Sequence, residues 1–113
     1  MQDQVIGEGA ARTASGELRV ALPPVAEIGS LAEARAAIDG LDAALAVLLE
    51  RRAAVAAVVQ RLKPVGGFAG RSPERERQIV EAMAEHAPVL GAERLARIMN
   101  AVIEAGLEAA ASR

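Results

Sequence analysis

A proline-free stretch from Leu31 to Leu62 constrains the fold more than any other feature of the chain. It is dominated by alanine and leucine, which favour helix, and Gly40 is the only weak position within it. At 1.5 Å per residue, a helix of about 32 residues is roughly 48 Å long. A compact domain of 113 residues is not that wide. We therefore predict one long helix that extends beyond the body of a single compact chain.

The apolar side chains of this helix follow the alternating three- and four-residue spacing of a coiled-coil seam. The seam skips one position, which is occupied by Arg52. Because such a rod cannot bury its seam alone, we expect an intertwined helical homodimer. The seam positions are Leu31, Ala34, Ile38, Leu41, Leu45, Leu48, Val55, Val59 and Leu62.

Two shorter helices are predicted after the long one, so the fold class is an all-α chain of three helices. Pro64 opens a glycine-bearing loop. Ser72 then provides an N-cap hydroxyl ahead of a proline, which predicts a helix to about His86. The apolar periodicity after the next break predicts a third helix from Ala92 to about Ala111.

Residues 1–30 differ in composition from the rest of the chain. They carry four glycines and two adjacent prolines, with no sustained periodicity. We predict a mostly irregular N-terminal extension over 1–30, with one possible extended piece at 18–22, and a helical domain over 31–113.

Composition excludes several classes of function. The formal net charge of −2 and the single aromatic residue, Phe68, provide neither a basic footprint nor stacking platforms for nucleic acid. The chain has no cysteine and one histidine, His86, so neither a thiolate zinc site nor a histidine cluster is expected, and His86 itself is expected at the surface.

The longest apolar run, residues 53–59, is too short to span a bilayer, and the first ten residues do not resemble a secretion signal. We expect a cytoplasmic protein.

Two cations near the end of the long helix indicate an anion site. Arg52 interrupts the apolar seam, where a cation needs an anionic partner. Lys63 follows 11 residues later, which returns to within about 20° of the same helix face, some 16 Å along the axis. The pair could clamp a small dianion, or Arg52 could form a buried ion pair while Lys63 stabilises the helix C-terminus. Arg35 lies about 100° around the helix and roughly 25 Å away, so it would serve the site of a second chain.

The segment RSPERER, residues 71–77, also favours anions. It places three arginines and two glutamates in a loop and a helix start, where backbone N–H groups point outward. A solvated helix start with local ion pairs would have the same composition.

Taken together, RAAIDGLDAALAVLLERRAAV, QRLK and RSPERERQIV resemble the all-helical chorismate mutase family. The resemblance runs in order from Arg35 to about Val80 and continues more loosely to Ala111, which is roughly two-thirds of the chain. It implies an intertwined dimer of three-helix chains that converts chorismate to prephenate by a Claisen rearrangement, without metal or coenzyme. Such an activity belongs to the shikimate pathway and aromatic amino acid biosynthesis.

The resemblance also implies roles for individual residues. Arg35 of the partner chain and Arg52 hold the two carboxylates, Lys63 donates to the ether oxygen, Arg75 supports the bound polar groups, and Glu76 accepts from the substrate hydroxyl. Ser72 stands where the family often has an acidic residue. An apolar wall that excludes water is expected from Val55, Val59, Ile103 and Leu107.

The chain departs from the family pattern in its third helix. Gly106 and Ala110 occupy positions where the family usually has a serine and a glutamine or glutamate that reaches the ether oxygen. Loss of one donor to a developing oxyanion costs on the order of 10² to 10³ in rate. We therefore expect weak activity, help from another group, or a changed function. Some short members of the family that the chain resembles become efficient when bound to the first synthase of the shikimate pathway, and such a complex is a further expectation here.

Other functions fit the same residues. An isochorismate pyruvate lyase or a 4-amino-4-deoxychorismate mutase would use a similar set of cations. A catalytically weak family member could act as a binding or regulatory helical dimer, and a plain helical bundle would have no small-molecule site.

Overall fold

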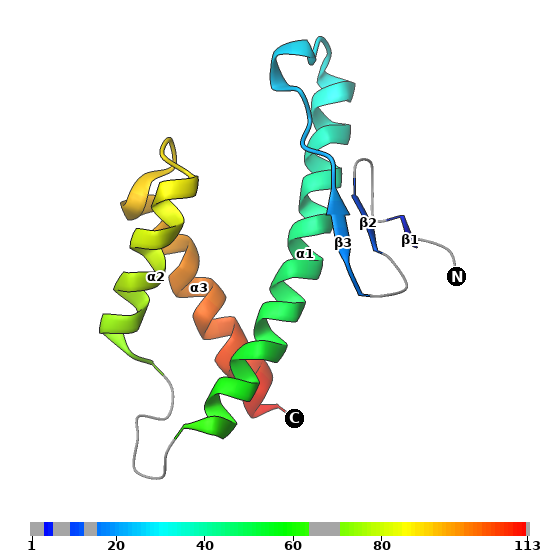
Figure 1. The fold of residues 1–113 in the computed structure, drawn as a ribbon. Helices are drawn as coiled ribbons and strands as arrows, with labels where there is room; N and C mark the ends of the chain where they lie inside the picture. Colours follow the sequence, from blue (N-terminus) through cyan, green and yellow to red (C-terminus); the bar gives the residue numbers. More distant parts are fainter. Residues whose placement is uncertain (1–3, 6–9, 13–15, 64–70, 113) are drawn as a thin grey trace. The chain divides into compact units, whose positions relative to one another are not determined.

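The computed structural model describes residues 4–5, 10–12, 16–63 and 71–112. They form two compact units, Met1–Glu50 and Arg51–Arg113, and the long helix α1 (Leu31–Leu62) contributes to both. Two shorter helices follow, α2 (Pro73–His86) and α3 (Gly91–Ala111) (Figure 1). The all-α fold class predicted for the chain is confirmed. The predicted loop that opens at Pro64 lies outside the described residues.

The first unit contains a small antiparallel sheet, which the sequence analysis did not predict. Its strands are β1 (Gln4–Val5), β2 (Ala10–Arg12) and β3 (Leu18–Val20), in the order β1-β2-β3 (Figure 1). Strand β3 coincides with the expected extended piece, whereas β1 and β2 add to the mostly irregular extension that was predicted. Strands of two or three residues are held by backbone hydrogen bonds and are too short to carry an alternating side-chain pattern. The predicted domain boundary at residue 30 stays a prediction.

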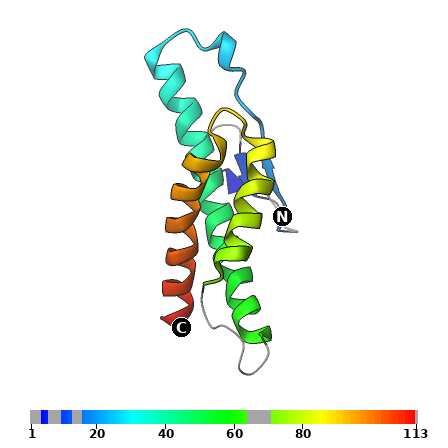
Figure 2. The ribbon, with the colours of Figure 1, turned by 90° about the vertical axis from the view of Figure 1, so that its left-hand side faces the viewer.

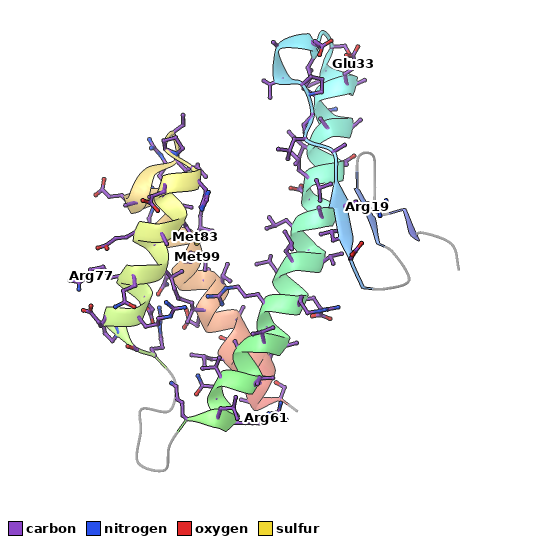
Figure 3. All side chains as sticks on the ribbon, viewed as in Figure 1. Arg19, Glu33, Arg61, Arg77, Met83 and Met99 are labelled. Atoms are coloured by element: carbon purple, nitrogen blue, oxygen red, sulfur yellow. The ribbon has the colours of Figure 1, made fainter. Side chains whose placement is uncertain are left out.

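Helix α1 begins at a reciprocal cap. The Ser30 Oγ accepts a hydrogen bond from the Glu33 N–H at 3.1 Å, and the Glu33 carboxylate accepts one from the Gly29 N–H at 3.3 Å (Figure 3). Such caps satisfy the free N–H groups of a first helical turn. A short 3-10 helix, η1 (Val25–Glu27), precedes the cap.

The buried positions of α1 are small residues, whereas the predicted seam is exposed. Gly40 and Ala44 are buried, while Ile38, Leu45 and Leu48 keep 54%, 51% and 54% of their surface accessible. Residues 21–28 and the first turns of α1 line an apolar groove together. The single chain therefore leaves its leucine-rich seam available for another surface.

In the second unit, α2 and α3 pack side by side (Figure 2). Leu95 and Met99 of α3 are buried, and Met83 of α2 points toward the space between the two helices (Figure 3). Gly106 of α3 is buried as well, and a Cβ at this position would meet the backbone of Ala53 in α1 at 4.0 Å. Small residues on both helices thus let α3 approach the last part of α1.

The helix bounds agree closely with those expected from the sequence. The structure begins α3 one residue earlier than predicted, at Gly91, which has a φ of +76° that glycine adopts without strain. Among the residues that the structure describes, no helix is long and apolar enough to cross a membrane.

Candidate functional site

The second unit contains a cavity of about 510 Å³ between the last part of α1, the start of α2 and the middle of α3. Its lining combines apolar side chains with polar and charged ones. Its lining residues are Arg52, Val55, Ala56, Val59, Gln60, Lys63, Ser72, Arg75, Glu76, Ile79, Ile103 and Leu107.

The cavity gathers nine of the ten residues predicted for the site. Each helix contributes part of them, so the site depends on how the three segments pack. The nine are Arg52, Val55, Val59, Lys63, Ser72, Arg75, Glu76, Ile103 and Leu107. Arg35, the tenth, belongs to the first unit and is not among the lining residues.

Three cations and one carboxylate line this cavity. Arg52 is half-buried and Arg75 is exposed, and neither guanidinium has a hydrogen-bond or ion-pair partner within the described part of the chain. The alternative of a buried ion pair for Arg52 therefore finds no support there. Lys63 follows the last turn of α1 and is half-buried. Guanidinium groups near an apolar wall favour a small anionic ligand with flat, forked acceptors such as carboxylates.

The start of α2 positions two of the polar groups. Ser72 is the N-cap, and its Oγ accepts a hydrogen bond from the Arg75 N–H at 3.3 Å. The Glu76 N–H donates to the Ser72 carbonyl at 2.9 Å and so begins the helical ladder. With Pro73 fixing the first helical residue, the backbone positions of Arg75 and Glu76 are set locally.

Glu76, the one carboxylate among the described residues that line the cavity, is held by Arg71. The Arg71 Nε donates to Glu76 Oε2 at 2.9 Å, and Nη2 donates to Oε1 at 2.6 Å. These hydrogen bonds lower the pKa of Glu76; partial burial opposes the shift, while the Arg71 charge and the Ser72 backbone reinforce it. The same hydrogen bonding raises the pKa of Arg71, with the Glu104 carboxylate adding to the effect. Glu76 is therefore an ionised acceptor near neutral pH.

The sequence analysis missed three lining residues, Ala56, Gln60 and Ile79. A signal for each was present, because Ala56 and Gln60 follow Arg52 at intervals of four residues on one helix face, and Ile79 follows Arg75 by four. Gln60 adds a half-buried amide to the polar side chains of the lining. Gly106 and Ala110 do not line the cavity, although Ala110 follows Leu107 by three residues.

No group of three or more metal-ligating side chains occurs among the described residues. The fold and the cavity together define a class: a helical protein with a cavity that three cationic side chains line. A family model described as chorismate mutase type II matches residues 34–110. The chain belongs to this family. Searches of curated proteins and of solved structures returned no match.

Proposed function

We propose that the protein is a chorismate mutase, which rearranges chorismate to prephenate. The observation that carries this proposal is the cavity in which Arg52 and Arg75 lack a carboxylate partner among the described residues and Lys63 provides a third cation. A dianion with two carboxylates and an ether oxygen complements that set of charges. Membership of the family supports the same reaction class.

The reaction is a pericyclic rearrangement, in which an ether C–O bond breaks as a C–C bond forms. It needs no acid, base or nucleophile, but it needs the flexible substrate held in a compact chair-like geometry. In the proposal, Arg52 binds a carboxylate and Lys63 donates to the ether oxygen as negative charge develops on it. Glu76 accepts from the substrate hydroxyl, and Arg75 supports the polar groups.

The apolar side chains of the lining serve the same chemistry. Val59, Ile103 and Leu107 line the cavity beside the cations. By displacing water, these side chains strengthen the electrostatic interactions of the fixed cations with the substrate. Arg52 stands on α1 and Lys63 directly follows the last residue of that helix, which limits their reorganisation when charge moves in the substrate.

A second copy of the chain is part of the proposal. The exposed seam of α1 provides an apolar face that a homodimer would bury, and Ile38, Leu45 and Leu48 lie on it. Arg35 of the partner subunit then supplies the cation for the remaining carboxylate.

The third helix lacks hydrogen-bond donors that the family usually has, because Gly106 and Ala110 occupy their positions. We therefore propose modest turnover for the protein alone and faster turnover in a complex with the first synthase of the shikimate pathway. The cytoplasmic location stays a prediction.

The test is incubation of the purified protein with chorismate, with the product identified by NMR. We expect prephenate to form faster than in buffer, and Arg52→Ala to abolish that gain while the protein stays folded. Pyruvate release from isochorismate, or turnover of 4-amino-4-deoxychorismate in place of chorismate, would assign the site to a related enzyme. Binding of a bicyclic dianionic transition-state mimic without turnover of any of these would support a binding or regulatory dimer, which the missing donor at Ala110 favours as the second candidate.

A further inference from the structure

Arg71 and Glu76 form the most closely defined side-chain contact at the start of α2. Two parallel hydrogen bonds, of 2.9 and 2.6 Å, join the guanidinium to both carboxylate oxygens. The side chains keep 35% and 23% of their surface exposed, respectively. A forked pair of this kind fixes the plane of the carboxylate as well as its position.

Arg71 makes this contact from outside the candidate site. Glu76 lines both the candidate cavity and a neighbouring groove of about 440 Å³ between α2 and α3, whereas Arg71 lines only the groove. Each carboxylate oxygen has a second lone pair, so Glu76 can still accept a hydrogen bond from a ligand in the cavity. Arg71 is thus placed behind the carboxylate rather than against a ligand.

We propose that Arg71 is a positioning residue for the reaction, which holds the Glu76 carboxylate at the cavity wall and away from the cations that bind substrate. This inference rests on the proposed function. A carboxylate without its forked partner would be free to pair with Arg52, Lys63 or Arg75, since all four side chains line the same cavity. Glu76 would then compete with the carboxylates of the substrate.

This competition predicts a specific kinetic signature. Loss of Arg71 should raise KM more than it lowers kcat, because a misplaced Glu76 opposes substrate binding. We expect Arg71→Gln to lower kcat/KM for chorismate by roughly tenfold or more, the scale of a lost charge-assisted pair. The effect should require the Glu76 charge, so Arg71→Gln added to Glu76→Gln should change kcat/KM by less than about twofold.

Helix α2 offers a matched control. Arg77 donates to Glu74 at 2.6 Å, equally short, but both side chains are exposed and neither lines the candidate cavity (Figure 3). Arg77→Gln removes the same charge six residues further along the chain, and we expect kcat/KM to stay within about twofold of the wild type.

The experiment is a double-mutant cycle on Arg71 and Glu76, with Arg77→Gln alongside and folding checked by circular dichroism. The positioning role would be overturned if the kcat/KM of the double variant equalled the product of the two single effects. An equal loss of kcat/KM in Arg77→Gln would also overturn it. If Arg71→Gln does not fold, Arg71→Lys keeps the charge without the fork and provides the same cycle. Wild-type protein that neither converts chorismate nor binds the dianionic mimic overturns the proposed function and this inference together, whereas an active wild type with unaffected Arg71 variants overturns this inference alone.

Discussion

Glu76 and Arg71 show how a single contact organises the charges of the site. The hydrogen bonds from Arg71 lower the pKa of Glu76, although partial burial opposes them. A glutamate is ionised near neutral pH even at its ordinary pKa, so the contact does not decide the charge of Glu76 there. It instead fixes the position of the carboxylate, which Arg71 holds from outside the cavity that Arg52 and Arg75 line.

The lowered pKa predicts a pH dependence of stability. A carboxyl group whose pKa is lower in the folded than in the unfolded chain stabilises the fold above its ordinary value of about 4.3. That contribution is lost as the pH falls through the lowered native pKa. Thermal unfolding between about pH 7 and pH 3 should show a Tm gap between wild type and Glu76→Gln that closes toward acid. Glu74→Gln removes an exposed ion pair and should give a smaller gap at neutral pH.

Substitution of Ala110 is expected to raise the turnover of chorismate. It follows Ile103 and Leu107 at helical spacing, so it shares the face of α3 that lines the cavity. We expect Ala110→Gln to raise kcat for chorismate by about tenfold or more, because it adds an amide donor for the ether oxygen. Ala109→Gln places the same side chain about 100° around the helix and should leave kcat unchanged. Equal values for the two variants would contradict this assignment.

At the scale of elements, the two serine caps support different parts of the protein by the same chemistry. Ser30 caps α1 through the Glu33 N–H, and Ser72 caps α2 through the Arg75 N–H. Only Ser72 lines the candidate cavity. Stability and activity should therefore respond differently to the loss of each cap.

Replacing either serine by alanine should lower the free energy of unfolding by about 1 kcal/mol, as for other N-caps. Urea denaturation measures that loss. Ser72→Ala should also lower kcat/KM for chorismate, whereas Ser30→Ala should leave it unchanged. Ser72→Asp retains a capping oxygen and should recover the stability. Equal activity in the two alanine variants would remove Ser72 from the site.

The sequence predicted the elements best where local signals are strong. Ser72 and Pro73 mark the start of α2, and the continuous alanine- and leucine-rich stretch marks α1. Both helices could therefore be predicted, and the structure contains both. Strand β2 escaped prediction because Ala10–Arg12 contains no β-branched or aromatic residue, whereas β3 coincides with the expected extended piece. The Arg71–Glu76 pair escaped it because the contact links a residue before the helix to one inside it, at a spacing of five that follows no helical rule.

At the scale of the whole molecule, the exposed seam and the position of Arg35 make one prediction about assembly. We expect Arg35→Ala and Arg52→Ala each to be nearly inactive alone. Co-refolded in equal amounts, they should recover about one quarter of wild-type activity, because half of the randomly mixed dimers contain one intact site of two. Assays of chorismate turnover at micromolar protein measure the recovery, and sedimentation measures the dimer.

Recovery in this mixture would show that the two arginines act on one site from different chains. Two Arg52→Ala preparations treated identically serve as the control and should recover nothing. A monomer in sedimentation, or a mixture no more active than its components, would contradict the shared site.

The contacts at the start of α2 join residues that are close in sequence, and this determines the order in which the parts of the site assemble during folding. The Ser72–Arg75 and Arg71–Glu76 contacts join residues at most five apart, and contacts of such short range form within microseconds. Arg52 and Lys63 are brought to them only when the chain packs α1 against the other helices. In the proposed dimer, Arg35 arrives last, in a step whose rate depends on protein concentration. A folding chain would thus set Glu76 and Arg75 in place before Arg52 and Lys63 reach them, and dilution would delay only the arrival of Arg35.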